Sequence, residues 1–240
     1  MEGFALFAAV LYVVTSGVLG AGLLRLSRSR GGAAASCLAW ALLSASLLQA
    51  LSIVAAAAGA GDVPPQGVWR LMFAALYAVT GVSASCMMRF TQIVYRPKQR
   101  VLTAIPSGVA ICCAYVALRV PFRNEAPVHS ATALSIYPVL LAGYLWTAAE
   151  SFRCWRDYRR ARDLDPVVVE RFRLWGTSAL AIVFWVAVAF LGQNAAWARG
   201  VGSGFGVVSS VALWFAFQPP ESFQRWLRSR AGRRPVGAAS

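Results

Sequence analysis

The sequence lacks the residues on which most metal and cofactor sites depend. It contains one histidine, His129, and one lysine, Lys98, both in short polar segments between apolar runs. A catalytic zinc in a membrane hydrolase needs three or four protein ligands, and a bis-histidine haem needs two histidines. A retinal Schiff base needs a lysine in the last helix, where this chain has none. We therefore expect no catalytic residue, no metal and no cofactor, and the chain is predicted not to be an enzyme.

Cysteines and charged residues are also too few for other classes of protein. The five cysteines are an odd number without a CxxC pair, which argues against a disulfide framework. Only 13% of the 240 residues are charged and 58% are hydrophobic, whereas about a quarter of a soluble globular chain is charged. The formal charge of +14 comes from arginines that lie between apolar runs, not in an aromatic-interleaved stripe of the kind that binds nucleic acid. The sequence predicts contact with membrane lipid and not with nucleic acid.

Seven apolar segments are long enough, or nearly so, to cross the hydrocarbon core, which takes about 20 residues. In lipid the backbone must satisfy its own hydrogen bonds, and these segments lack the alternation of barrel strands, so helices are expected. The fold class predicted is an all-α seven-transmembrane helix bundle in residues 1–220, followed by a basic tail in residues 221–240. The segments are Phe4 to Leu24, Ala33 to Ala58, Leu71 to Val94, Val101 to Val120, Ser130 to Ala149, Leu174 to Gly192 and Val201 to Phe217.

The positions of the basic residues predict the orientation. Eighteen of the 23 Lys and Arg lie in the first, third and fifth connections and the tail, four lie in the other connections, and Arg89 lies inside a segment. Cytoplasmic connections of membrane proteins are enriched in Lys and Arg. We expect a multi-pass protein of the cell inner membrane with its N-terminus outside and its C-terminus in the cytoplasm. The first arginines follow the first apolar run, as in a retained signal anchor.

Arg89 has two interpretations. It lies seven residues before Arg96, or about 10 Å deeper in the membrane at 1.5 Å per residue. Its long side chain can extend to the lipid headgroups. Alternatively, it forms an ion pair with Glu150, which ends the fifth segment on the same side, and this switch pair holds one of two states of the bundle.

Glycines at helical spacing indicate close helix packing. Their small-xxx-small pattern is typical of membrane helix interfaces, and a ligand lying against bare backbone is the alternative. We expect the first apolar segment to pack against the last. The glycines are Gly17, Gly20 and Gly22 in the first segment and Gly200, Gly202, Gly204 and Gly206 in the last.

Two segments on the cytoplasmic side are expected to be helical outside the membrane. Asp165 can cap a helix whose first residue is Pro166, so the sixth helix is predicted to begin about two turns before the bilayer. Residues 221–230 form a short amphipathic helix with an apolar side, which is either an interfacial anchor or part of a docking surface for a cytoplasmic protein. The docking residues are Arg159, Arg160, Arg162, Phe223, Arg225, Trp226, Leu227 and Arg228, with Phe223, Trp226 and Leu227 on the apolar side.

The segment Leu213 to Leu227, LWFAFQPPESFQRWL, resembles the closing motif of seven-helix sensor regions of bacterial histidine kinases and diguanylate cyclases. The stretches YRRAR at 158–162 and ERFR at 170–173 are similar to those regions too. In these families an aromatic-x-Pro-Pro step leads from the last helix to a cytoplasmic output domain. We expect no output domain here, so the resemblance implies a sensor-like module that acts through a separate cytoplasmic signalling protein.

The leading functional hypothesis is therefore a non-enzymatic membrane signalling or regulatory protein. A small-solute transporter or channel subunit and a membrane scaffold are the alternatives. The near absence of acidic residues from the apolar segments argues against a proton-coupled pump, because proton relays usually use buried acids.

The orientation is testable with alkaline phosphatase fusions, because this enzyme is active only outside the cytoplasm. We expect fusions after Asp62 or Asn124 to be active and fusions after Lys98 or Asp163 to be inactive, since basic connections stay inside. The reverse pattern of activity would show that the orientation is inverted.

Overall fold

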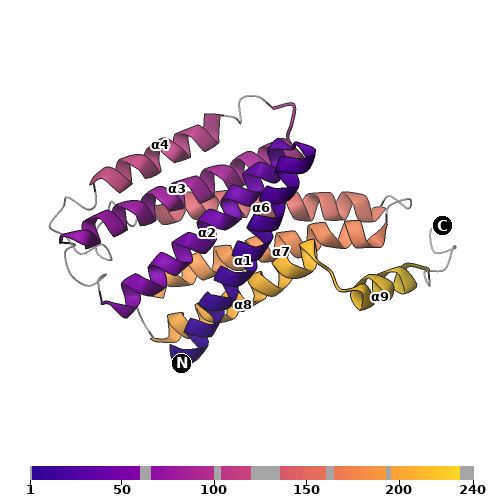
Figure 1. The fold of residues 1–240 in the computed structure, drawn as a ribbon. Coiled ribbons are helices and arrows are strands. Elements are labelled where there is room, and N and C mark those ends of the chain that lie inside the picture. Colours follow the sequence, from indigo (N-terminus) through magenta and orange to yellow (C-terminus); the bar gives the residue numbers. More distant parts are fainter. Residues whose placement is uncertain are drawn as a thin grey trace.

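The structure is a computed structural model, and it describes residues 2–59, 66–99, 104–119, 136–160, 165–192 and 196–232. The described residues form eight helices and no strand (Figure 1). A helix is present in each of the seven predicted segments, so the all-α prediction is confirmed there; His129 and Arg162 lie outside the described residues. The helices are α1 (Glu2–Arg30), α2 (Ala33–Ala57), α3 (Val68–Tyr95), α4 (Ala104–Arg119), α6 (Ile136–Arg160), α7 (Pro166–Gly192), α8 (Ala196–Phe217) and α9 (Glu221–Gly232).

Five of these helices, α1, α2, α3, α7 and α8, are long and apolar enough to cross a membrane. α4 is apolar but has only 16 described residues, and α6 carries Glu150 and several arginines in its second half. Large apolar side chains such as Phe7, Leu118 and Leu191 face outward on the helices. Outward-facing apolar side chains on long apolar helices are what a lipid environment requires, and they support a helical membrane protein.

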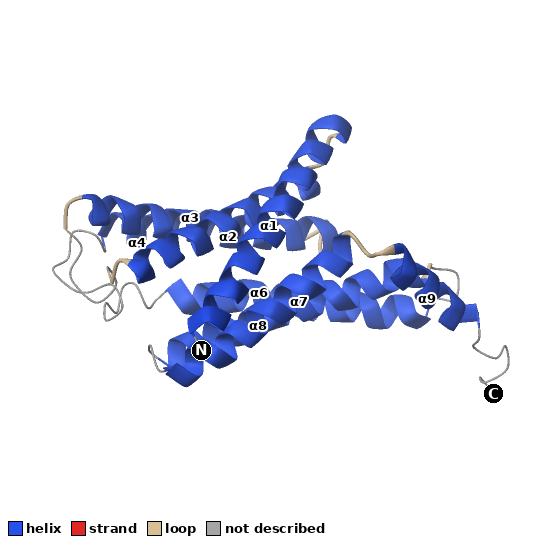
Figure 2. Ribbon diagram, turned by 60° about the horizontal axis from the view of Figure 1, so that its bottom comes forward, coloured by secondary structure: helices blue, strands red, loops and turns tan. Residues whose placement is uncertain are grey.

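Six helices form a closed ring. Successive contacts join α1 to α2, α2 to α3, α3 to α6, α6 to α7, α7 to α8 and α8 back to α1, whereas α4 lies outside the ring and packs mainly on α3 (Figures 1 and 2). All six ring helices contribute side chains to one buried cluster. Between apolar helices in lipid, van der Waals packing of such side chains is a main source of stability. Members of the cluster, one from each helix, are Leu19, Leu42, Met87, Tyr144, Trp175 and Leu213.

Some of the glycines lie at close helix contacts, but not at the contact expected from the sequence, and a Cβ at Gly22 or Gly204 would meet nothing within 4 Å. The predicted packing of the first segment on the last is confirmed, because α1 contacts α8. However, a Cβ at Gly20 would lie 2.8 Å from Cγ of Leu43 in α2, and a Cβ at Gly202 would lie 3.0 Å from Cδ1 of Trp185 in α7. The indole of Trp185 in turn meets the ring of Tyr12 edge-on at 5.5 Å. Gly20 and Gly202 therefore admit α2 and α7, and the indole of Trp185 in α7 contacts both α8 and Tyr12 in α1.

At one end of the bundle, α6 and α7 extend beyond the ends of α1, α2 and α3, with α9 beside them (Figure 1). We call this the arginine-rich end; α1, α3, α6 and α8 end there and α2 and α7 begin there. The predicted start of α7 is confirmed: the backbone N–H of Val167 donates to Oδ1 of Asp165 at 3.0 Å, and Pro166 is the first helical residue. We call the part that extends beyond α1, α2 and α3 the projection. It consists of residues 152–160 of α6, residues 165–173 at the start of α7, and α9.

Candidate functional site

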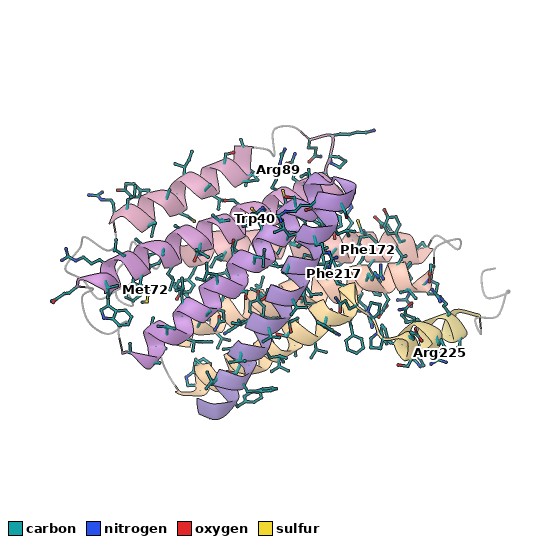
Figure 3. All side chains as sticks on the ribbon, viewed as in Figure 1. Trp40, Met72, Arg89, Phe172, Phe217 and Arg225 are labelled. Atoms are coloured by element: carbon teal, nitrogen blue, oxygen red, sulfur yellow. The ribbon has the colours of Figure 1, made fainter. Side chains whose placement is uncertain are left out.

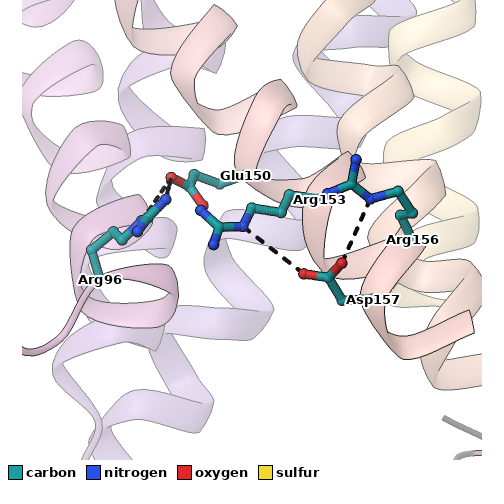
Figure 4. A network of polar contacts seen from close by, with 5 residues as sticks. All are labelled: Arg96, Glu150, Arg153, Arg156 and Asp157. Atoms are coloured by element: carbon teal, nitrogen blue, oxygen red, sulfur yellow. Dashed lines mark hydrogen bonds and ion pairs between the residues drawn. The ribbon is translucent and has the colours of Figure 1, made fainter. Parts of the chain in front are cut away.

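An ion pair joins α3 to α6 at the arginine-rich end. Nη2 and Nε of Arg96, the residue after α3, lie 2.7 and 2.8 Å from Oε1 of Glu150 in α6 (Figure 4). The two side chains are 28% and 11% exposed. Two N–H groups on one carboxylate make a charge-assisted contact that is stronger than a neutral hydrogen bond. The pair therefore fixes the end of α3 against the middle of α6.

Hydroxyl pairs continue this contact toward the interior. Oγ1 of Thr91 lies 2.7 Å from Oγ1 of Thr147, and the Tyr95 hydroxyl lies 3.0 Å from Oγ of Ser151. Residues four apart lie on one face of a helix, so matching faces of α3 and α6 meet here. Hydrogen bonds between membrane helices stabilise by about 0.6 kcal/mol each on average. We call this contact the α3–α6 seam; it comprises Thr91, Tyr95, Arg96, Thr147, Glu150 and Ser151.

The structure gives Glu150 a different partner from the predicted Arg89. Arg89 instead donates from Nη1 to Oε1 of Gln92 in its own helix. Arg89 and Glu150 lie at different levels of the bundle. Each hydroxyl pair joins a residue of α3 to the residue of α6 that is 56 further along the sequence. By the same offset, the residue of α6 that is level with Arg89 is Leu145. Glu150 lies more than a turn closer to the end of the bundle, at the level of Arg96. In this structure Glu150 is paired with Arg96, and a second state in which Glu150 contacts Arg89 stays a prediction.

Polar side chains from several helices meet in the centre of the ring. The hydroxyls of Tyr12, Tyr144 and Ser83 lie close together in the buried interior. Ser83 donates to the carbonyl of Ala41 at 3.0 Å. This polar cluster draws on α1, α6, α3 and α2, and the bond from Ser83 stabilises the contact between α3 and α2, because a polar group buried without a partner is costly. Among the described residues, Ser85 Oγ and Trp175 Nε1 are buried without such a partner.

A shallow hollow of about 400 Å³ lies between the end of α1 and the start of α2. It opens outward, and Arg28 and Trp40 are among the residues that line it. The hollow does not include any residue of the α3–α6 seam. It therefore provides no route to the polar groups that hold the ring together.

The C-terminal helix α9 is fixed to α7. Leu227 is 8% exposed, α9 contacts α7, and Nη2 of Arg228 lies 3.2 Å from Oδ2 of Asp165. The Phe223 ring meets the ring of Phe215 in α8 edge-on at 5.2 Å. Phe215 lies near the end of α8, and Asp165 comes immediately before α7. Because α9 contacts both residues, it runs beside the first turns of α7 and away from the bundle.

This position changes the interpretation of the tail. The predicted short amphipathic helix is present, but its apolar side is divided: Leu227 is buried, whereas Trp226 remains 48% exposed. The backbone hydrogen bond from Val167, followed by Arg228, holds the pKa of Asp165 below its usual value. Asp165 therefore both caps α7 and holds α9, a second role that the sequence did not indicate.

The predicted docking residues lie at the same end of the molecule. Arg159 and Arg160 are in the last turn of α6, and Arg228 reaches the start of α7. Arg159 lies over the ring of Trp155 at 5.4 Å. Arg225 is exposed on α9, and Figure 3 shows it far from Arg89. The remaining docking residue, Arg162, lies outside the described part of the chain.

Sequence reasoning missed Arg96 and the hydroxyl pairs of the seam. Arg96 was counted only as one of the basic residues in a connection, and Thr91, Thr147 and Ser151 attracted no attention. The pattern that marks them is two polar residues four apart on each of two apolar helices, Thr91 with Tyr95 and Thr147 with Ser151. Such a pair of patterns indicates two polar helix faces that can meet.

No protein-family model matches the chain, and no curated protein or solved structure matches it either.

The α3–α6 seam predicts a specific energetic coupling. In a double-mutant cycle of Arg96→Ala and Glu150→Ala, the two losses of unfolding free energy should be non-additive by about 0.5 to 3 kcal/mol, because the residues contact each other. The measurement is reversible unfolding in bicelles. The matched control is Arg89→Ala combined with Glu150→Ala, which should be additive; stronger coupling in the control than in the test pair would contradict this arrangement.

The contact between Asp165 and Arg228 predicts a pH-dependent position of α9. Because the pKa of Asp165 is lowered in the folded state, its stabilising charge is present at neutral pH and is lost as the pH falls through that lowered pKa. Asp165→Asn should mimic the loss at neutral pH while keeping the helix cap. Amide hydrogen exchange in residues 221–232 should become about two to five times faster, as expected for an exposed ion pair worth up to about 1 kcal/mol. Asp157→Asn, which removes two exposed ion pairs of α6, should leave exchange in α9 unchanged.

Proposed function

We propose that the chain is a non-enzymatic signalling or regulatory protein of a bacterial inner membrane, and that it acts through a separate cytoplasmic protein. In this proposal all seven helices from α1 to α8 span the membrane, with the N-terminus outside and the projection in the cytoplasm. The five long apolar helices support it, as does the excess of basic residues at the arginine-rich end. α4 and α6 would supply the remaining two spans.

One observation carries the proposal: α6 belongs to both the ring and the projection. It runs without interruption from Ile136 to Arg160, and its middle holds Glu150 of the α3–α6 seam. The helix continues for ten residues beyond Glu150, or about 15 Å at 1.5 Å per residue. A shift of α6 at the seam would therefore move the end of the projection, because a helix moves as a rigid element and interface shifts of about 1–2 Å are a common form of switching.

The seam has the properties of a two-state contact. It combines an ion pair of limited exposure with hydroxyl pairs, so its bonds are lost together if α3 and α6 slide. It also joins the half of the chain formed by α1–α4 to the half formed by α6–α9, which otherwise meet mainly where α1 contacts α8. A stimulus in the first half would reach the projection through the seam.

Deletion of residues 221–240 tests the signalling function. The truncated chain should still insert, because the ring does not include α9, but it should no longer recover a cytoplasmic partner from cross-linked membranes of its host. Deletion of residues 233–240 alone, which keeps α9, is the matched control and should retain the partner. Equal recovery by both deletions would contradict a role for α9.

Proteoliposomes test the main alternative. A signalling protein should give no uptake or efflux of ions, sugars or amino acids above that of empty vesicles. Saturable flux that Arg96→Ala changes would instead favour a transporter or channel subunit.

A further inference from the structure

We infer that the exposed side of α9 binds an acidic surface of a cytoplasmic protein and not the lipid bilayer. This side consists of Ser222, Phe223, Arg225, Trp226 and Arg230. The inference rests on the proposed function, and it adds the chemistry of the partner and the residues that contact it.

The first argument is the position of α9. An interfacial helix lies in the membrane plane with its whole apolar side in lipid. Here Leu227 is buried in the protein, and Arg228 reaches Asp165, which precedes the first residue of α7. Asp165 is followed by Pro166 and three valines and then by Glu170, Arg171 and Arg173, so Arg228 places α9 beside the start of α7, before its long apolar part. Among the ring contacts of the described residues, Trp226 is joined to the bundle only through Phe223, and the Phe223 ring meets that of Phe215 near the end of α8.

The second argument is the composition of the exposed side. The ring of Trp226 stacks on that of Phe223, with centroids 5.9 Å apart and planes at 22°. The guanidinium of Arg230 lies 5.3 Å from the centre of the Trp226 ring. Trp and Arg are the residues most often found at the energetic centres of protein interfaces. The stacking also orders these side chains before a partner arrives, which lowers the entropy cost of binding.

The third argument is charge. The described residues of the projection carry nine arginines and four acidic residues. Three of the acids already contact arginines of the projection: Asp157, Asp165 and Glu170. Arg225 and Arg230 form no ion pair with any described residue, so the charge on the exposed side of α9 is positive. A second copy would bring the same charge and be repelled, whereas an acidic surface is complementary.

A photo-cross-linker placed on α9 tests the inference directly. Benzoylphenylalanine is introduced at Trp226, and separately at the exposed Ser222 one turn earlier on the same side, in the full chain expressed in its host. We expect both positions to cross-link a cytoplasmic protein through a peptide, identified by mass spectrometry, in which Asp and Glu outnumber Lys and Arg. The same probe at Phe7, which is 58% exposed on α1, should give lipid adducts only.

Charge reversal provides the second measurement. Arg225→Glu with Arg230→Glu should lower the yield of the adduct at Ser222 about tenfold, because like charges across an interface are repelled. Arg25→Glu with Arg28→Glu is the matched control at the end of α1 and should leave the yield unchanged. Equal yields from the two double variants would overturn the inference.

The adducts separate the failure of the inference from that of the proposed function. Lipid adducts on α9, or a peptide of a second copy, would overturn the inference. Two outcomes would overturn the inference and leave the proposed function standing. In the first, a cytoplasmic protein is cross-linked through a peptide in which acidic residues are not in excess. In the second, a cytoplasmic protein is recovered with the intact chain but is never cross-linked to α9. If no cytoplasmic protein is cross-linked to α9, and deletion of residues 221–240 causes the loss of no cytoplasmic partner, both the inference and the proposed function are overturned.

Discussion

The contact between α3 and α6 is the constraint on which the rest of the structure depends. Without it the two halves of the chain meet mainly through α1 and α8, and the ring is open on one side. Apolar helices in lipid gain little from the hydrophobic effect when they associate, so close packing and hydrogen bonds must hold them together. Thr91, Thr147 and the ion pair of Arg96 with Glu150 supply those bonds where the ring closes.

The elements of the fold were predictable because their causes are local. Apolar length identifies the helices, and Asp165 with Pro166 identifies the start of α7. The partner of Glu150 was not predictable, because it depends on how far α3 is shifted along α6. Arg89 and Arg96 are about two helical turns apart along α3 and its end, so the sequence is compatible with either arginine as the partner of Glu150. Only the register of α3 against α6 selects Arg96.

The same distinction applies to the glycines and to α9. Small residues show that another helix comes close, but they do not identify it; Gly20 admits α2, and Gly202 admits the indole of Trp185. Periodicity correctly groups Phe223, Trp226 and Leu227 on one side of a helix. It does not predict which of them is covered: Leu227 is buried in the structure, where α9 contacts α7, while Trp226 stays exposed.

The position of α4 outside the ring gives α3 a mechanical role. α4 packs mainly on α3 and shares a second buried cluster with it, formed around Phe73, Tyr77 and Cys113. In the proposed seven-span arrangement α4 is a perimeter helix exposed to the bilayer, and a mismatch in thickness tends to tilt such a helix. Any such force on α4 passes to the ring mainly through α3, whose end is held by Arg96. α3 thus connects the outer helix α4 to the contact that closes the ring.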